Sequence, residues 1–485
     1  MRVDFNRGLT KPALVILAAP RDRLAIVLWA AVPIAPLAAG LAARALLARA
    51  PARLAVDLAQ PLVVVTAWGS FGAGLFALWA AGIAAGALAL TFLCLRAARV
   101  GGDLPSGSRG RTALVLCAGL GLAAGLAWPC VFSSDVYAYA AYGDQALHGQ
   151  NPYRPAPAAA HDAYLDAARW QWTRISFPAC VYGPVFVAAG AAAVAVTEGR
   201  IAPTLWLLRL GACAAFLAAI LVLDAVLAGT RRRRIHVALF ALNPVALWSA
   251  AEGHNDTFVI LAVLGAVLAA RRGRPRLAGA LVALTPSVKA IGLLAGPPFW
   301  ALLGRRERGR FGWTFVLTGL AVAALVIPLQ STALGGLARH GRYAPQFSLQ
   351  GLIGPVPALI IAGGLFIAAL RDLRRGRAAG AVRLALALWL AIPNPYPWYA
   401  LWIAPLAAAA PWSWETAALL GATFSIGLRY LPDAYGDMAG TPGALLTLGE
   451  LLPAGLALLA LRPPAAWGTS RGSGDLVGEP ERQPP

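Results

Sequence analysis

The feature that most constrains this chain is a succession of long apolar runs separated by short clusters of arginine. A bilayer core about 30 Å thick needs roughly 20 helical residues to cross it. Because lipid offers no partner for backbone N–H and C=O groups, each run should form a helix. Only 13% of the residues are charged and 59% are hydrophobic, which excludes a soluble protein. The sequence therefore predicts an all-α fold, a polytopic transmembrane helical bundle of about 11–13 spans.

The net charge of +20 indicates membrane topology and not nucleic-acid binding. The arginines lie in clusters between apolar runs, and not on one folded basic face. Basic residues at the N-terminus and around 96–111 place those ends in the cytoplasm, so residues 131–181 should form an extracytoplasmic loop. The five cysteines show no paired short spacing. A bridge between Cys130 and Cys180 stays open, beside the alternative that both are small apolar residues near helix ends.

The runs indicate one transmembrane domain over residues 24–462. Residues 1–23 precede it as a cytoplasmic N-terminus, and residues 463–485, rich in Gly, Ser and Pro, follow as a disordered cytoplasmic tail.

Two apolar runs do not predict simple crossings. The run 277–303 begins and ends at basic clusters and is interrupted at residues 285–287, Thr-Pro-Ser, so it predicts a broken re-entrant hairpin. The run 183–197 is shorter than the roughly 20 residues that a crossing needs. It is therefore expected to be partly buried or re-entrant, and the number of crossings up to residue 229 stays open.

Asp135, at the start of the outer loop, is the leading candidate for catalysis. A carboxylate at the end of an apolar span is costly unless it is used or paired. A helix over residues 135–147 would place Asp135, Tyr139 and Tyr142 on one side and Tyr137 elsewhere. Two alternatives stand beside this one: Asp135 as a helix cap or solvated acid, and the tyrosines as interfacial anchors of an amphipathic surface helix.

Further polar residues occur where a membrane protein rarely keeps them. His254, Asn255 and Asp256 begin an apolar helix, either as an N-cap or as a polar cluster that faces a cavity. Lys289 lies inside an apolar run, where a cation usually has a partner, although snorkelling to the cytoplasm is the alternative.

A second outer loop carries cations against the positive-inside pattern. These residues would suit an external phosphate, and an ordinary surface loop is the alternative. They are Arg339, His340 and Arg342.

Several motifs occur together, in one order, over roughly residues 110–400. They are Ser134-Asp135-Val136-Tyr137-Ala138-Tyr139, Gly149-Gln150-Asn151-Pro152-Tyr153, Tyr182-Gly183-Pro184, Leu242-Asn243-Pro244, Gly253-His254-Asn255-Asp256, Val288-Lys289-Ala290 and Pro397-Trp398-Tyr399. This combination resembles the polyprenol-phosphate-mannose-dependent mannosyltransferases of bacterial envelopes, which belong to the GT-C superfamily.

The resemblance implies a GT-C-like bundle in the plasma membrane that takes a sugar from a polyprenyl-phosphate donor on the extracytoplasmic side. In this family Asp135 would match the acidic residue of the first outer loop, the proposed catalytic base. Asn151 and Tyr153 would match the second motif of that loop, and Lys289 the lysine of the broken hairpin. Many members carry adjacent acids in this loop, whereas Asp135 stands between Ser134 and Val136. Dependence on a divalent metal therefore stays open, and no other cofactor is expected.

We therefore expect an inverting transfer of a hexose, with mannose as the expected sugar, to an envelope glycan or glycolipid, with Asp135 as general base. Cations would stabilise the leaving phosphate, and aromatic rings would contact the sugars. The expected substrate-binding residues are Tyr137, Tyr142, Asn151, Tyr153, Tyr182, His254, Asn255, Asp256, Lys289, Arg339, His340, Arg342 and Trp398. The alternative is a transporter or flippase of a lipid-linked sugar, which predicts internal repeats that the sequence does not display.

Overall fold

The computed structural model describes residues 20–51, 54, 61–65, 68–99, 107–129, 131–154, 162–168, 179–230, 233–326, 345, 347–377, 379–410 and 414–435. These residues form α-helices and short 3-10 turns, and the described part contains no β-strand beyond two isolated bridges. The all-α class predicted from the sequence is confirmed.

The helices are α1 (Pro20–Leu47), α2 (Ser70–Arg99), α3 (Gly107–Ala127), α4 (Asp135–Leu147), α5 (Ala163–Ala167), α6 (Pro184–Val196), α7 (Ile201–Val226), α8 (Arg233–Ala241), α9 (Pro244–Ala251), α10 (Asp256–Arg271), α11 (Pro275–Leu284), α12 (Gly296–Leu302), α13 (Arg305–Val326), α15 (Leu349–Ile353), α16 (Pro355–Arg374), α17 (Ala379–Ala391), α18 (Ala400–Ala409), α19 (Trp414–Ser425) and α20 (Tyr430–Tyr435).

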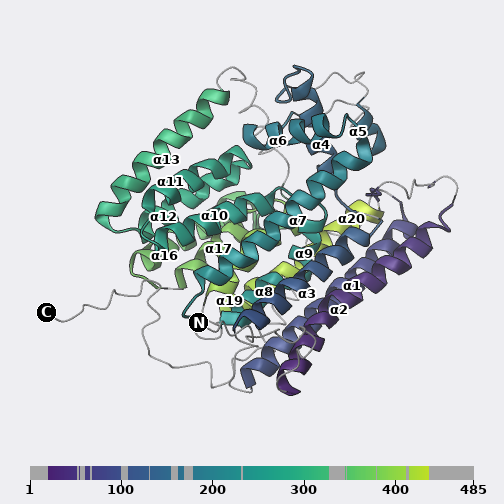
Figure 1. Ribbon diagram of the computed structural model, residues 1–485, viewed down its shortest axis with the longest axis horizontal. Helices are drawn as coiled ribbons and strands as arrows, with labels where there is room; N and C mark the ends of the chain where they lie inside the picture. The colour runs from purple at the N-terminus through teal and green to yellow at the C-terminus, as the bar shows by residue number, and fades with distance from the viewer. Residues whose placement is uncertain are drawn as a thin grey trace, which may run out of the picture.

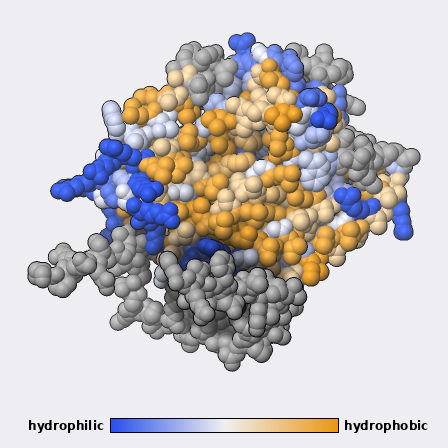
Figure 2. Space-filling model, viewed as in Figure 1, coloured by the Kyte–Doolittle hydropathy of each residue, from blue (hydrophilic) through white to orange (hydrophobic). Residues whose placement is uncertain are grey.

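The long helices run in similar directions through one bundle (Figure 1). Helices α1, α2 and α3 pack together along one edge, α11 packs against α13 on the other side, and α4, α5 and α6 gather at one end (Figure 1). Figure 2 shows a broad apolar band across this face, with hydrophilic residues toward its edges. Such a band is the surface that a lipid bilayer covers.

Four described helices are long and apolar enough to cross a membrane, by length and composition: Gly69–Cys94, Ser108–Ala127, Ile201–Val226 and Pro355–Arg374. The pair α8 and α9, bent by 47° at its break, would be a fifth. The chain is thus a polytopic membrane protein, as predicted, and the larger number of spans stays a prediction.

The broken hairpin is present. Helix α11 ends at Leu284, a 3-10 turn covers Thr285–Ser287, and a second 3-10 segment, Ala290–Ala295, leads into α12. Pro286 in the first turn has no N–H to continue the helix, which is the physical reason for the break.

The short run after residue 183 is a helix that packs within the protein. Helix α6 spans only Pro184–Val196 and lies against α4. The two helices approach so closely that a Cβ on Gly143 would lie 2.3 Å from the carbonyl carbon of Gly190. A side chain at either position would therefore separate the helices, which agrees with the expectation that this run is partly buried.

We expect Gly143→Ala to destabilise the fold by about 1–3 kcal/mol, because the added methyl group overpacks the contact between α4 and α6. Unfolding of the purified protein in detergent measures this. Gly119→Ala, also inside a helix but with open space around the new Cβ, is the matched control. Equal unfolding midpoints for the two variants would contradict the tight contact.

The tyrosines of α4 are buried in protein and do not anchor a surface helix. Tyr137, Tyr139 and Tyr142 are each less than 5% exposed. Their rings lie in one apolar cluster with residues of α6 and α7. The interpretation as interfacial anchors of an amphipathic helix is therefore wrong, because α6 and α7 cover the faces that lipid would otherwise contact.

Two isolated bridges connect the segments that precede α4 and α6 to other parts of the fold. Val131 pairs with Val64, and Tyr182 pairs with Lys289 of the broken hairpin. Gly183 is required at the second bridge, because a Cβ there would lie 2.1 Å from the carbonyl carbon of Ser287. This contact brings the loop that carries Tyr182 against the hairpin that carries Lys289.

Of the predicted N-terminal segment 1–23, residues 1–19 lie outside the described residues, and residues 20–23 already belong to α1; the predicted tail 463–485 lies wholly outside the described residues. So do the proposed phosphate-binding residues Arg339, His340 and Arg342. Cys130 lies outside them too, while Cys180 is a buried free cysteine.

Candidate active site

Asp135 begins α4 and faces three polar side chains from other parts of the site. The hydroxyl groups of Tyr139 and Tyr182 each donate to its Oδ2 atom at 3.4 Å. Nδ1 of His254 lies 3.7 Å from the same oxygen. The Asp135 side chain keeps 22% of its surface exposed, so this carboxylate is held in place and still accessible. Asp135 lies in the first turn of α4.

Burial, followed by the charge of Asp135, raises the pKa of both Tyr139 and Tyr182 well above that of an ordinary tyrosine. Both phenols therefore stay protonated over the physiological pH range and remain hydrogen-bond donors to the carboxylate. The predicted grouping of Asp135 with Tyr139 on one side of α4 is present.

A second carboxylate lies behind His254. Nε2 of His254 is 3.2 Å from Oε2 of Glu252, and the hydroxyl of Tyr430 donates to the same oxygen at 2.6 Å. Glu252 and His254 are both buried. The His254 ring stacks on Trp398 with 4.2 Å between ring centroids. Because Trp398 also stacks on Tyr396 at 4.4 Å, its indole supports the imidazole from behind.

Lys289 forms an ion pair with Asp256. Its Nζ lies 2.8 Å from both carboxylate oxygens of Asp256, which is completely buried. The same ammonium group lies 5.4 Å from the ring centre of Tyr399 and 5.6 Å from that of Trp402. The alternative of snorkelling is therefore wrong: desolvation of Asp256 makes the pairing the favourable arrangement.

Asn255 occupies the N-cap position of α10, but its side chain makes no capping hydrogen bond. Its Oδ1 instead lies 3.5 Å from the Tyr139 hydroxyl, whose single proton is shared between this oxygen and Oδ2 of Asp135. Its Nδ2, like Nδ1 of His254, is buried and has no hydrogen-bond partner among the described residues. A buried polar group without a partner costs about 1–3 kcal/mol. The simple cap interpretation is wrong for Asn255, because its side chain makes no capping hydrogen bond.

Other predicted site residues lie further from the carboxylate. Tyr137 donates to the backbone oxygen of Leu62, on another side of α4. The Tyr142 ring lies 6.2 Å from the ring of Tyr182, between centroids. Tyr153 donates to the backbone oxygen of Tyr182 at 3.1 Å, so it supports the segment that places Tyr182.

Asn151 shapes the loop that holds Tyr153. Its Oδ1 accepts from the backbone N–H of Tyr153 at 3.0 Å, which closes a local turn. Among the described residues, no group of three or more His, Cys, Asp or Glu side chains is arranged to hold a metal ion.

Sequence reasoning missed Arg209, a fully buried arginine of α7. It donates to the backbone oxygens of Ala251 at 2.7 Å, Pro61 at 2.9 Å and Gly125 at 3.4 Å. Ala251 ends α9 just before the polar turn of Glu252 and His254, so Arg209 fixes the position of that turn. A lone arginine within the apolar run 203–229 was the available signal.

We expect Arg209→Leu to destabilise the protein by at least about 2 kcal/mol, because it leaves buried carbonyl groups without donors. Denaturant unfolding of the purified protein measures the loss. Arg200→Leu, an exposed arginine directly before the same helix, is the control. An Arg209→Leu protein that unfolds like wild type would show that this arginine does not hold the turn.

The family model described as alpha-(1->6)-mannopyranosyltransferase, N-terminal domain, matches residues 25–305. The chain belongs to this family. The match includes Asp135, the polar turn and Lys289. It ends before Trp398, so the family model does not include the stacking support of His254.

The chain is also similar to alpha-(1->6)-mannopyranosyltransferase A of Mycobacterium tuberculosis (strain ATCC 25618 / H37Rv). The two are 28% identical over 330 residues, which cover 58% of this chain and 61% of that relative. No solved structure matches the chain.

Proposed function

We propose that this protein is an integral membrane mannosyltransferase that uses a polyprenyl-phosphate sugar as donor. The observation that carries the proposal is the Asp135 carboxylate, which keeps 22% of its surface exposed, accepts hydrogen bonds from Tyr139 and Tyr182, and lies 3.7 Å from Nδ1 of His254. The family match supports mannose as the sugar. An envelope glycan or glycolipid would be the acceptor.

The proposed reaction is a single inverting displacement. Asp135 takes the proton of an acceptor hydroxyl while that oxygen attacks the anomeric carbon of the donor sugar. The bond from the anomeric carbon to the phosphate oxygen breaks, and polyprenyl phosphate leaves with the electron pair. A positioned base of this kind contributes about 100-fold to 10,000-fold in rate. Hydrogen bonds from Tyr139 and Tyr182 keep the reactive carboxylate oriented.

The leaving phosphate needs a cation or hydrogen-bond donors that are already in place. Lys289 is suited to this role, since Asp256 and the surrounding aromatic rings hold its ammonium group. The unpaired amide of Asn255 is a neutral donor nearby in the same turn. Arg339, His340 and Arg342 stay candidates from the sequence alone.

A lipid-linked donor gives a reason for the membrane location. The prenyl chain stays among helices or lipid, while the sugar phosphate reaches the loops that carry Asp135 and Tyr182. We place this site on the extracytoplasmic side of the plasma membrane, because the arginine clusters assign the opposite ends of the helices to the cytoplasm.

The test uses purified protein in lipid nanodiscs with a membrane glycolipid acceptor. Radiolabelled mannose is supplied either on polyprenyl phosphate or on GDP. We expect transfer from the lipid-linked donor and at least about tenfold less from GDP-mannose, since no Rossmann or other nucleotide motif occurs in the sequence. Equal use of GDP-mannose would overturn the donor assignment. Movement of the lipid-linked sugar across the bilayer without transfer would instead support a flippase.

A further inference from the structure

A series of buried polar side chains, His254 and then Glu252, extends from Asp135 into the protein. His254 is only 2% exposed and lies between the two carboxylates, with Nδ1 toward Asp135 at 3.7 Å and Nε2 toward Glu252 at 3.2 Å. Glu252 is 4% exposed and also accepts the hydroxyl proton of Tyr430. Nothing in the family match assigns a role to Glu252.

The hydrogen bonds determine which imidazole nitrogen carries the proton. With Glu252 ionised, Nε2 of His254 is the donor to it, and the lone pair of Nδ1 then faces Asp135. Two acceptors that face one another form no hydrogen bond, which accounts for the 3.7 Å separation and for the unpaired state of Nδ1. Once Asp135 has taken a proton, its O–H can donate to Nδ1.

We propose that His254, held by Glu252, is the proton acceptor behind Asp135. This inference rests on the proposed transferase function. The proton of the acceptor hydroxyl moves to Asp135 as the glycosidic bond forms, and then to Nδ1 of His254. The resulting imidazolium is neutralised by the Glu252 carboxylate, so the charge of the site stays balanced. Glu252 is a positioning residue, because it acts through His254 and touches no substrate.

The groups around His254 are compatible with its role as proton acceptor. Several titratable or charged groups surround these side chains. They are Tyr139, Tyr182, Tyr396 and Tyr399 near Asp135, Arg209 and Tyr430 near Glu252, the Lys289–Asp256 pair, and Arg429 and Asp433 beyond Tyr396. The stacked Trp398 ring prevents the imidazole from turning away from Asp135.

The experiment compares Glu252→Gln with Glu198→Gln, an exposed control, in the lipid-donor assay over a range of pH. Glutamine keeps the shape of Glu252 and removes its charge. We expect kcat to fall about 10-fold to 100-fold with KM for the donor unchanged within a factor of two. The variant lacks the Glu252 carboxylate, which otherwise favours protonation of the neighbouring His254 and Asp135. The fall of kcat at acidic pH should therefore begin at a lower pH than in wild type.

The experiment distinguishes a failure of this inference from a failure of the proposed function. If wild type transfers mannose and Glu252→Gln matches Glu198→Gln in kcat and in pH profile, the inference is overturned and the transferase stands. If wild type transfers nothing from the lipid-linked donor, the proposed function falls and this inference with it. His254→Gln, which keeps a polar group but accepts no proton, should match Glu252→Gln, and a wild-type profile in it would also overturn the inference.

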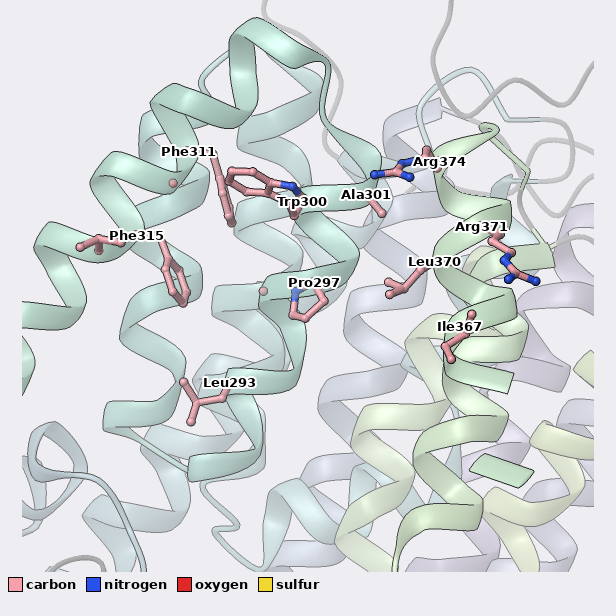
Figure 3. A pocket seen from close by; sticks show the side chains of 13 residues that line it. Leu293, Pro297, Trp300, Ala301, Phe311, Phe315, Ile367, Leu370, Arg371 and Arg374 are labelled. Atoms are coloured by element: carbon pink, nitrogen blue, oxygen red, sulfur yellow. The ribbon is translucent and has the colours of Figure 1, made fainter. Parts of the chain in front are cut away.

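A separate cavity of about 590 Å³ lies between α12, α13 and α16 (Figure 3). Its lining is largely apolar and includes Leu293, Pro297, Trp300, Phe315 and Leu370. Leu293 is 56% exposed and Trp300 is 45% exposed. The cavity is therefore a groove that opens onto the outer surface of the helical bundle. In a membrane protein those surroundings are lipid.

One end of this groove is positively charged. Arg371 and Arg374 line it, and in Figure 3 the Arg374 side chain extends from α16 toward Ala301 of α12. Arg308 reaches the same end, where it donates to the backbone oxygen of Trp300 at 2.8 Å. The neighbouring acid, Asp372, is already paired with other arginines. The end of the groove is therefore complementary to an anion.

We infer that this groove binds an anionic phospholipid, with an acyl chain along the apolar lining and the phosphate at Arg371 and Arg374. Basic pockets between membrane helices bind such head groups. This inference is independent of the catalytic proposal, because it uses other residues and another ligand.

Native mass spectrometry of the purified protein with added phosphatidylglycerol or phosphatidylcholine tests it. The double variant Arg371→Gln/Arg374→Gln removes the two arginines of the groove. The control, Arg272→Gln/Arg274→Gln, removes two exposed arginines elsewhere. We expect the groove variant to retain at least about fivefold less phosphatidylglycerol than the control. Leu370→Trp, which narrows the groove, should lower retention as well. Equal retention by the two double variants, equal retention of the two lipids by wild type, or undiminished retention by Leu370→Trp would each overturn the inference.

Discussion

Asp135→Asn is expected to lower mannosyl transfer by at least about 100-fold, because asparagine keeps the hydrogen bonds of the site but cannot accept the acceptor proton. Transfer from the polyprenyl-phosphate donor, measured per folded protein, gives the effect. The loss should appear in kcat more than in KM, since the carboxylate acts on the reacting proton.

Asp144→Asn is the matched control for this change. Asp144 lies on the same helix, is partly exposed and pairs only with His148 among the described residues. The control should keep activity within about a factor of two of wild type, since a surface substitution of this kind usually leaves the stability of the fold nearly unchanged. Activity in Asp135→Asn equal to that of this control would remove Asp135 from the chemistry and leave the transferase without a base.

Lys289→Met is expected to destabilise the protein by about 3–5 kcal/mol, since it leaves the buried charge of Asp256 without its partner. Denaturant unfolding of the purified protein measures the change. Methionine is unbranched and only one atom shorter than lysine, so it keeps most of the packing near Trp402 and the effect reports mainly on the lost charge. Transfer should also be lost if Lys289 stabilises the leaving phosphate.

The double variant Lys289→Met/Asp256→Asn separates stability from activity. Removal of both charges takes away the unpaired ion, so most of the stability should return while transfer stays absent. Arg274→Met, at an exposed arginine, is the control for loss of a cation. Full transfer by the double variant would show that the pair is structural and that Lys289 does not serve the phosphate.

Sequence alone determined the features that depend on local pattern. The length and hydrophobicity of the runs identified a polytopic helical membrane protein, since the bilayer imposes helix length and backbone pairing on each run separately. The helix over 135–147 and the break at Thr285–Ser287 follow from residue spacing and from proline, and both are present. The grouping of Asp135 with Tyr139 also follows, because helical periodicity places residues four apart on one side.

Tertiary structure decided which polar groups meet. Lys289 pairs with Asp256, 33 residues away, and Glu252 meets Tyr430, 178 residues away. No local period encodes such contacts, so the sequence left Lys289 between pairing and snorkelling and gave no partner for Glu252. The burial of α4 was likewise decided by tertiary packing. Gly143 of α4 lies directly against Gly190 of α6, and this close approach of the two helices buries the tyrosines of α4. Asp135 was evident from its place at the end of an apolar run, whereas its neighbours became evident only when separate helices packed together.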